Sequence, residues 1–382
     1  MAGLEGACRE LRRSSEAEER AWGTRANLEG GDDMVRRRSS RRWGILLGTG
    51  FLLAAVFTMV EGGAAPALAA EFRLKGVSNS RPQVQFKMWE WMETELPKRT
   101  NGRVNLEVTS LPELGLTGFE LVRVMKAGLV DMADVLPTYV SGDVPLIEGV
   151  DLPGFFSLEE FDKSHKAHVA WHKIMKANEA KLGGAFVGSY AYAYQVLYSR
   201  KPIQALTDLR GLKVRVFGAA QTDFIRALGG EPVSLPVAEV YTALERGAVD
   251  AAITGTIAGF SLKWYEVTKY MVDLQIGPVM IALVVSKRTW DKLPADLRKV
   301  LEEVGADLTV RGWDLARSST LEGMEENKKK GMTWIPRKPE WRAVIQQAVQ
   351  RSVLPGWLKR AGADGKAAFN EVRGHFTGFV AP

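Results

Sequence analysis

A segment of fourteen residues recurs once in this chain, and this repeat constrains the fold more than any other feature of the sequence. Residues 120–133 align with residues 239–252 after a shift of 119 positions, with five identities. Each copy has the pattern of a short amphipathic helix, a glycine suited to the left-handed C-cap, and a buried strand that opens with Val-Asp. Strand-like runs precede the copies at 103–108 and 212–217. The repeat predicts two similar α/β lobes with largely parallel sheets, unless two common helix-to-strand turns resemble each other by chance.

The regions around the two copies predict the elements that would join the lobes. No low-complexity linker interrupts the chain, so the lobes should share an interface and a cleft. We expect residues 71–195 mainly in lobe I, residues 196–285 mainly in lobe II, and residues 286–382 as C-terminal helices that pack across both. Periodicity predicts strands at 71–77, 185–199 and 277–286, the last two crossing between lobes, and helices at 83–99, 159–182, 293–330 and 339–361.

The segment before the first expected strand has the order of an export signal. Five arginines between Arg36 and Arg42 precede an uncharged apolar run at 43–60, and small residues follow up to Ala70. This order is typical of a secretory signal peptide, so we expect residues 34–70 to be removed after Ala69 or Ala70. An uncleaved membrane anchor is the alternative, because the apolar run approaches the length that spans a bilayer.

Two further features of the N-terminal region bear on export. The pair Arg41-Arg42 fits a twin-arginine signal as an alternative to the general secretory route. Residues 1–33 are polar and lack apolar periodicity, so we interpret them as a non-native upstream extension, with Met34 as the true start.

Cysteine usage and charge exclude several classes of protein. The only cysteine is Cys8, so the mature chain would contain none. This excludes a disulfide framework, cysteine-ligated zinc, iron–sulfur clusters and a redox cysteine pair. A chain without thiols suits the oxidising periplasm. The net charge of +6 is spread along the chain without a basic patch or stacking motif, so no nucleic-acid partner is expected.

Eight short motifs stand in the order in which they occur in a known family, between about residues 72 and 305. The chain resembles the substrate-binding subunits of tripartite ATP-independent periplasmic (TRAP) transporters, of the DctP type. The motifs are Thr100–Val108, Val150–Phe156, Asp208–Val216, Ala227–Gly230 with Pro232, Glu239–Leu244, Gly247–Asp250, Trp264–Tyr270 and Trp290–Pro294.

The resemblance implies an α/β fold with the two-lobed periplasmic-binding-protein (Venus-flytrap) architecture, a central cleft, and long crossing strands and a crossing helix. It implies a monomeric periplasmic protein that closes on a small organic acid and delivers it to the small and large permease subunits. It also implies no catalysis, no cofactor and no stable membrane insertion after cleavage.

Arg215 is the leading candidate for contact with the acid. Lys213 and Arg215 alternate with Leu212, Val214 and Val216 along a predicted strand, so the two cations project from the face opposite the apolar residues. A guanidinium presents a planar fork that matches a carboxylate. The resemblance implies that Arg215 clamps the substrate carboxylate, whereas a salt bridge at the end of the sheet is the alternative reading.

Two positions depart from the pattern of the resembled family. Gln195 stands where many members carry a second arginine, and Thr254 stands where many carry an asparagine that faces the ligand. Rings of Tyr190, Tyr192 or Tyr194 could line the pocket or belong to the core. These departures favour a monocarboxylate with an apolar or aromatic body. The predicted substrate contacts are Arg215, Gln195, Thr254, Tyr192, Tyr194, Phe217, Val237 and Arg81.

Three histidines carry the main alternative from another functional class. His165, His168 and His172 would share one helix face at a spacing compatible with a metal site, as in a metal-dependent periplasmic hydrolase. The Glu of the H-E-x-x-H motif is missing, and an exposed Lys/His-rich helix face is the other reading. The chain also lacks G-x-S-x-G and a phosphate loop. A periplasmic receptor for a signalling partner is a further alternative. We expect reversible ligand capture with no catalytic, metal or cofactor site.

Overall fold

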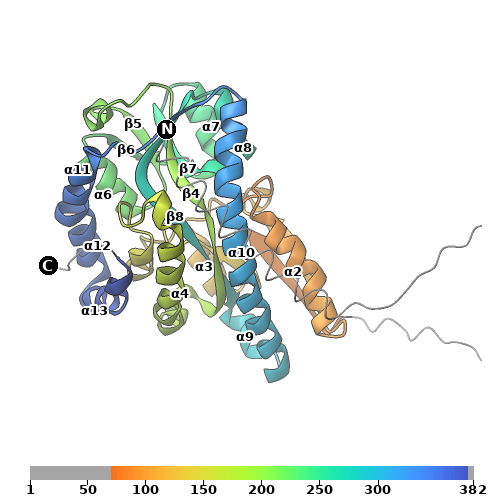
Figure 1. The fold of residues 1–382 in the computed structure, drawn as a ribbon. Coiled ribbons are helices and arrows are strands. Elements are labelled where there is room, and N and C mark those ends of the chain that lie inside the picture. The colour runs from red at the N-terminus through yellow and green to blue at the C-terminus, as the bar shows by residue number, and fades with distance from the viewer. Residues whose placement is uncertain (1–69, 377–382) are drawn as a thin grey trace, which may run out of the picture.

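A computed structural model describes residues 70–376, in which nine strands form a single mixed sheet. The sheet has the order β2-β1-β3-β8-β4-β7-β5-β6, and β9 pairs with β8 (Figure 1). The predicted upstream extension and nearly all of the predicted signal peptide lie outside the described residues. Within the described residues, no helix is both long and apolar enough to cross a membrane. The strands are β1 (Phe72–Ser78), β2 (Val104–Ser110), β3 (Met132–Val135), β4 (Gly184–Ser199), β5 (Lys213–Val216), β6 (Glu231–Ser234), β7 (Ala251–Gly255), β8 (Tyr270–Ser286) and β9 (Thr333–Ile335).

Two long antiparallel strands, β4 and β8, run through the whole sheet and join its two halves. The C-terminal part of β8 pairs with β3, next to β1 and β2, and this group of strands forms the first half. The C-terminal part of β4 pairs with β7, next to β5 and β6, and this group forms the second half. The expected crossing strands are therefore confirmed, although β8 begins at Tyr270 rather than near Gly277.

The glycines of the repeat end equivalent helices in the two halves. Helix α3 (Leu121–Lys126) is followed by Gly128, and helix α7 (Val237–Glu245) is followed by Gly247. The φ angles of these glycines are 64° and 71°, in the left-handed region that favours glycine.

The aspartates of the repeat also have equivalent roles. Asp131 Oδ2 accepts the backbone N–H of Lys75 in β1 at 2.8 Å. Asp250 Oδ2 accepts the backbone N–H of Lys213 in β5 at 3.0 Å. Each half has the same strand order, β2-β1-β3 or β6-β5-β7. The repeat thus marks two equivalent α/β units rather than a chance similarity.

The structure corrects one detail of the repeat. The run at 212–217 forms β5, which is the counterpart of β1, and β6 stands between it and the second copy. The sequence of β6, Glu-Pro-Val-Ser, contains a proline and lacks an alternating apolar pattern. An edge strand tolerates proline because its outer N–H groups need no partner, so this short strand left little signal in the sequence.

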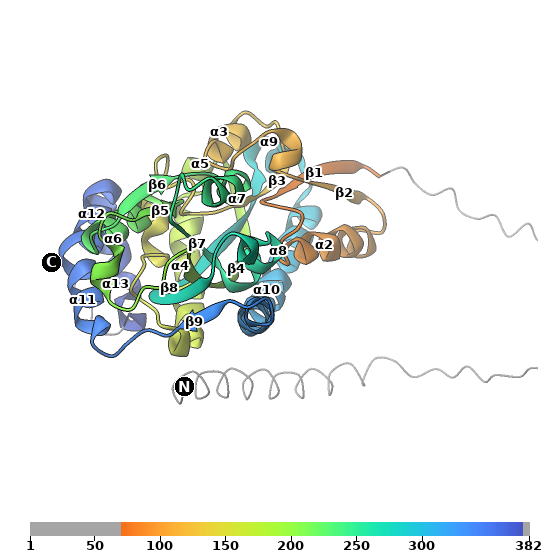
Figure 2. The same cartoon turned by 90° about the horizontal axis from the view of Figure 1, so that it is seen from above.

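The helices cover both faces of the sheet, and the C-terminal helices lie on the side of the molecule away from α2 (Figure 2). The helix expected at 159–182 is divided at Asn178, whose side chain donates to the carbonyl of Ile174 (2.8 Å). The α-helices are α2 (Phe86–Arg99), α3 (Leu121–Lys126), α4 (Phe161–Ala177), α5 (Glu179–Leu182), α6 (Ala219–Ala227), α7 (Val237–Glu245), α8 (Thr256–Ser261), α9 (Lys287–Lys292), α10 (Ala295–Lys329), α11 (Trp341–Ala348), α12 (Leu354–Ala361) and α13 (Ala363–Val372). Short 3-10 helices occupy Pro112–Leu114, Pro145–Val150, Leu158–Glu160, Leu206–Leu209, Trp264–Glu266 and Arg373–His375, and a π-helical turn occupies Val349–Val353.

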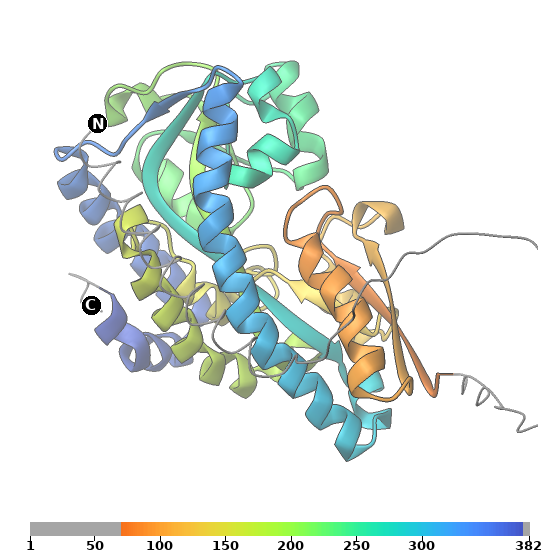
Figure 3. The ribbon, with the colours of Figure 1, turned by 45° about the vertical axis from the view of Figure 1, so that its right-hand side comes forward.

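Helix α10, with 35 residues, runs along both halves of the molecule (Figure 3). Its threonines complete the hydrogen bonding of β4 where the pairing of β4 with β8 is irregular. Thr309 Oγ1 accepts the backbone N–H of Ser189 at 3.2 Å, and Thr320 Oγ1 accepts that of Tyr194 at 3.0 Å. The crossing strand β4 and the crossing helix α10 are therefore joined by hydrogen bonds at two points along their length.

Candidate functional site

The guanidinium of Arg215 lies in the interior, and the residue is only 1% exposed. Its Nε donates to the carbonyl of Leu235 (2.9 Å), one terminal nitrogen donates to the carbonyl of Ile253 (2.8 Å), and the other donates to the hydroxyl of Tyr139 (3.3 Å). The ring of Phe217 lies 4.6 Å from the guanidinium carbon. Burial lowers the pKa of Arg215, but an arginine keeps its charge in such surroundings.

The positive charge of Arg215 has no counter-ion within the described part of the chain. All three of its hydrogen-bond acceptors are neutral oxygens, and no described carboxylate forms an ion pair with it. The salt bridge that sequence reasoning left open is therefore not found. A buried charge without a partner costs several kcal/mol of folding free energy, on the order of the cost of breaking a buried pair. An unpaired buried cation has the chemistry to bind an anion.

Tyr139 reaches Arg215 from the first half of the sheet, because it lies in the loop that follows β3. Its ring packs on Phe119, with centroids 4.9 Å apart, and edge-on to Phe217 at 5.5 Å. A cavity of about 350 Å³ adjoins these three rings. The cavity is lined by Phe119, Arg123, Thr138, Tyr139, Ser141, Gly142 and Asp143 from the first half and by Phe217, Gly218, Ala219, Thr222 and Ser234 from the second.

The cavity lies where the carboxyl ends of β3 in the first half and β5 in the second half meet, and β3 is parallel to β1 as β5 is parallel to β6 and β7. Open α/β sheets bind ligands at such carboxyl ends. The two halves also touch there, since the backbone N–H of Ala219 donates to Ser141 Oγ (3.2 Å). Sequence reasoning missed Tyr139 and Phe119. The signal that could have found Tyr139 is its position in the turn that follows β3, the strand that ends the first repeat.

A buried carboxyl group lies on the first half, close to the site. Asp134 accepts hydrogen bonds from the indole N–H of Trp89 (2.7 Å) and the hydroxyl of Tyr190 (2.8 Å). Burial raises the pKa of Asp134 to about 7, although these hydrogen bonds oppose the rise. The ring of Tyr190 therefore belongs to the interior of the first half.

Several of the predicted contacts lie close to Arg215 or to Tyr139. Phe217 stacks on the guanidinium of Arg215. Thr254 directly follows Ile253, whose carbonyl accepts a hydrogen bond from that guanidinium. The hydroxyl of Tyr192 accepts a hydrogen bond from Asn79 (2.8 Å). Burial, with Asp134 and Tyr139 nearby, raises the pKa of Tyr192, so the loop after β1 lies close to Tyr139.

The other predicted contacts have protein partners of their own. The hydroxyl of Tyr194 donates to Asp273 (3.0 Å), and the amide of Gln195 donates to the carbonyl of Ala193 (2.7 Å). Val237 begins α7 and packs into the core of the second half. Arg81 is exposed and forms a two-point ion pair with Glu113 (2.7 and 3.1 Å).

The three histidines of α4 do not converge on a metal site. His168 is fully buried between Asp151 (2.9 Å) and the carbonyl of Ser164 (2.6 Å), which corrects the reading of an exposed helix face. His165 stacks on Trp313, and His172 contacts Ser189. Burial lowers the pKa of both His165 and His172 to about 4. Among the described residues, no group of three or more His, Cys, Asp or Glu side chains could hold a metal ion.

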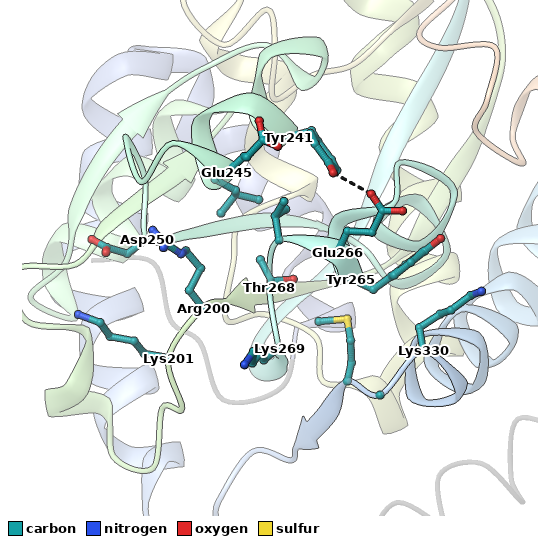
Figure 4. Close-up of a pocket in the computed structure, with 14 residues that line it drawn as sticks. Arg200, Lys201, Tyr241, Glu245, Asp250, Tyr265, Glu266, Thr268, Lys269 and Lys330 are labelled. Atoms are coloured by element: carbon teal, nitrogen blue, oxygen red, sulfur yellow. Dashed lines mark hydrogen bonds between the residues drawn. The ribbon is translucent and has the colours of Figure 1, made fainter.

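A larger concavity of about 970 Å³ lies near the amino end of β7, and Arg215 is not among the residues that line it (Figure 4). Its cations, such as Arg200 and Lys330, are exposed and share the concavity with Glu245 and Glu266. Glu266 accepts a hydrogen bond from Tyr241 (2.7 Å). Exposed charges of both signs bind a carboxylate less strongly than a buried unpaired arginine. We therefore place the candidate site at Arg215, beside the smaller cavity that its neighbours Tyr139 and Phe217 line.

Comparison with protein families supports the motif-based resemblance. The chain matches the DctP model, described as bacterial extracellular solute-binding protein, family 7, over residues 76–356. It is 27% identical over 274 residues to the C4-dicarboxylate-binding periplasmic protein DctP of Rhodobacter capsulatus, covering 71% of this chain and 81% of that protein.

Solved structures share the fold over most of the chain. DctP7 of Bordetella pertussis, an extracytoplasmic solute receptor binding pyroglutamic acid, is 26% identical with a TM-score of 0.74 and covers 79% of this chain and 99% of its own. A TRAP periplasmic solute-binding protein from Desulfovibrio salexigens, with bound orotic acid, is 20% identical with a TM-score of 0.74 and covers 79% of this chain and 98% of its own. The two-lobed architecture expected from the sequence is confirmed by these similarities.

Proposed function

Because the chain belongs to the DctP family of bacterial extracellular solute-binding proteins, family 7, we propose that it captures a small organic acid by binding the carboxylate to Arg215. The family consists of transport proteins and not of enzymes. The observation that carries the proposal is the buried guanidinium without a counter-ion. Of its five N–H donors, three have protein acceptors, so donors remain for a carboxylate.

The surroundings of Arg215 favour a monocarboxylate with a flat apolar or aromatic body. The rings of Phe119, Tyr139 and Phe217 adjoin the cavity and offer faces on which such a body could stack. Gln195 supplies a neutral amide where a second arginine would favour a second carboxylate. A similar receptor, DctP7, binds pyroglutamic acid, which has one carboxylate on a flat ring.

We propose further that the ligand-bound form delivers the acid to the membrane permease. Contacts from both lobes would favour the closed state, and closure would complete the surface that the small and large permease subunits recognise. The protein would act as a periplasmic monomer, without stable membrane insertion after the signal peptide is removed. The similar DctP protein of Rhodobacter capsulatus is periplasmic, which supports the proposed location.

A thermal-shift screen of organic acids tests the proposed function. The panel should include pyroglutamate, succinate, galacturonate and aromatic monocarboxylates, each measured with and without EDTA. An acid present at a hundred times its dissociation constant should add about 2.7 kcal/mol to the free energy of unfolding. The Arg215→Ala protein, if folded, should lose this stabilisation. A full shift in that variant would contradict the carboxylate clamp.

Mass spectrometry of the periplasmic fraction tests export separately. We expect a mature N-terminus at Ala70 or Glu71, after removal of residues 34–69 or 34–70. Recovery of only the full-length chain in the membrane fraction would favour an uncleaved anchor instead.

A further inference from the structure

Buried polar atoms without partners gather in the segment between β1 and α2, residues 78–85. Ser78, Asn79, Gln83 and Gln85 are each at most 5% exposed. Five of their side-chain atoms are fully buried and make no hydrogen bond within the described structure. These atoms are Ser78 Oγ, Asn79 Oδ1, Gln83 Oε1, Gln85 Oε1 and Gln85 Nε2.

The 78–85 segment lies beside the candidate site. Asn79 donates its amide N–H to the hydroxyl of Tyr192. Gln85 stands one helical turn before Trp89, whose indole bonds to Asp134 at the end of β3. Residues four apart share a helix face, so Gln85 lies on the side of α2 that packs on Asp134. Thr138, which lines that cavity beside Tyr139, has a buried hydroxyl oxygen that is likewise without a hydrogen bond.

So many unpaired buried atoms in one segment favour a bound molecule that supplies the missing hydrogen bonds. A buried polar group without a hydrogen bond destabilises the folded state, and folded proteins contain only a few such groups per hundred residues. Gln85 is the clearest case, because neither its carbonyl oxygen nor its amide nitrogen has a partner. A ligand that enters between the lobes would satisfy these atoms.

The chemistry of the unpaired atoms restricts the ligand. Asn79, Gln83 and Gln85 present carbonyl oxygens, which need a donor, and Gln85 also presents an amide N–H, which needs an acceptor. A ligand with a second carboxylate would present only hydrogen-bond acceptors to these oxygens, which are acceptors themselves. The cation of the segment, Arg81, is held at the surface by Glu113.

We propose that the 78–85 segment is a neutral subsite for the far end of the ligand, and that this end carries both N–H and C=O groups, as in a lactam, an imide or a primary amide. This inference rests on the proposed function, because Arg215 holds the carboxylate at the near end. The ligand is then a monocarboxylic acid whose body ends in an amide group. Dicarboxylates of similar length bind more weakly.

Calorimetric titration with three probe acids tests the subsite. Pyroglutamate carries a carboxylate and a lactam on one ring, cyclopentanecarboxylate keeps the ring and the carboxylate without the lactam, and succinate carries a second carboxylate. We expect the wild-type protein to bind pyroglutamate at least about tenfold more tightly than either other acid, because one unmet hydrogen bond in the site costs about that factor.

The variant Gln85→Leu separates the subsite from the carboxylate clamp. It should weaken pyroglutamate binding about tenfold or more and change cyclopentanecarboxylate binding by less than about threefold, because leucine removes the amide at similar volume. Gln350→Leu, at an exposed glutamine far along the chain, should change neither affinity. If Gln85→Leu does not fold, Gln83→Leu provides the same comparison. Thermal unfolding of each variant checks its fold.

The possible outcomes distinguish the subsite from the proposed function. Equal wild-type affinity for the two ring acids, abolished in Arg215→Ala, would overturn the subsite and keep the clamp. An equal loss of both ring acids in Gln85→Leu would also overturn the subsite. Binding that survives in Arg215→Ala would instead contradict the proposed function. Failure of pyroglutamate to bind at all would overturn the subsite, since this acid is its simplest complement.

Discussion

Three neutral oxygens fix the fork of Arg215 before any ligand binds. Two of them are backbone carbonyls of the second half, and the third is the Tyr139 hydroxyl of the first half. A fork held in this way loses little conformational entropy when it binds a carboxylate. The shape of the guanidinium, and not its charge alone, should therefore determine affinity.

Substitutions at Arg215 and Gln195 test this view. Affinity for a confirmed ligand should fall in the order Arg, Lys, Ala at position 215, because lysine keeps the charge but loses the two-point geometry. The Ala variant should lose about 2–5 kcal/mol of binding free energy, at least roughly thirtyfold in affinity. Gln195→Ala should lose only about 0.5–1.5 kcal/mol. Calorimetry that finds equal losses at both positions would show that the charge does not dominate.

Asp134 predicts a specific pH dependence of stability. Its pKa is about 7 in the folded protein and about 4 in an unfolded chain. The folded state therefore holds the proton more tightly, and the stability that Asp134 contributes is complete below about pH 4 and is lost as the pH rises to about 7. The full change is at most about 4 kcal/mol.

Asp134→Asn should remove this dependence, because an amide does not titrate in this range. Urea unfolding at pH 4.5 and pH 8 should show the variant gaining stability relative to the wild type as the pH rises. The exposed Asp143→Asn provides a matched control. A difference between wild type and Asp134→Asn that stays constant with pH would contradict the raised pKa.

At the scale of elements, α10 depends on glycines that face β4. A Cβ atom on Gly305 would lie 2.1 Å from the carbonyl oxygen of Val187, and one on Gly312 would lie 2.2 Å from the Cβ of Tyr190. Glycine is ordinarily unfavourable inside a helix. Here it allows the helix backbone to approach the crossing strand closely enough for Thr309 and Thr320 to bond to it.

Gly305→Ala should therefore destabilise the protein, although alanine favours helices. The helix would have to move away from β4, and we expect a loss of about 1–3 kcal/mol in the free energy of unfolding. Val310→Ala, at a half-exposed position of the same helix (52%), should change stability by less than about 0.5 kcal/mol. Chemical denaturation measures both. A stabilised Gly305→Ala protein would contradict the close packing of α10 on β4.

At the scale of the whole molecule, the crossing strands bend where the two halves meet. The pairing of β4 with β8 shifts between Tyr192 and Leu197. Nearby in β8, Gln275 and Gly277 adopt φ angles of 58° and 90°. Such irregular strand segments can absorb the backbone rotation of a hinge, so we expect the lobes to move about this region.

Spin labels on opposite edge strands test this movement. The described residues contain no cysteine, so cysteines that replace Glu107 in β2 and Glu231 in β6 would be labelled selectively once Cys8 is removed. A confirmed ligand should shift the distance distribution between the labels toward shorter values. The same pair in Arg215→Ala should not respond at matched ligand concentration. An unchanged distribution in the ligand-binding protein would contradict closure.

The sequence by itself determined the repeated units, the crossing strands and the long helices of this protein, and it singled out Arg215 as the main cation. Helices and strands follow from local periodicity, and the repeat follows from glycine and aspartate residues that meet the same backbone requirements in each copy. The placement of Arg215 opposite an apolar strand face is likewise a property of neighbouring residues. These features depend on interactions over a few positions, which a sequence displays directly.

Only the tertiary structure decided which side chains surround Arg215 and which remain unpaired. Tyr139 lies 76 residues away in the chain, and it meets Arg215 because β3 and β5 end at the same boundary between the halves. Distant segments also determine the burial of the α4 histidines, the raised pKa of Asp134 and the unpaired amides of residues 78–85. Burial and hydrogen-bond partners are set by packing across the sheet, and local sequence patterns carry little information about them.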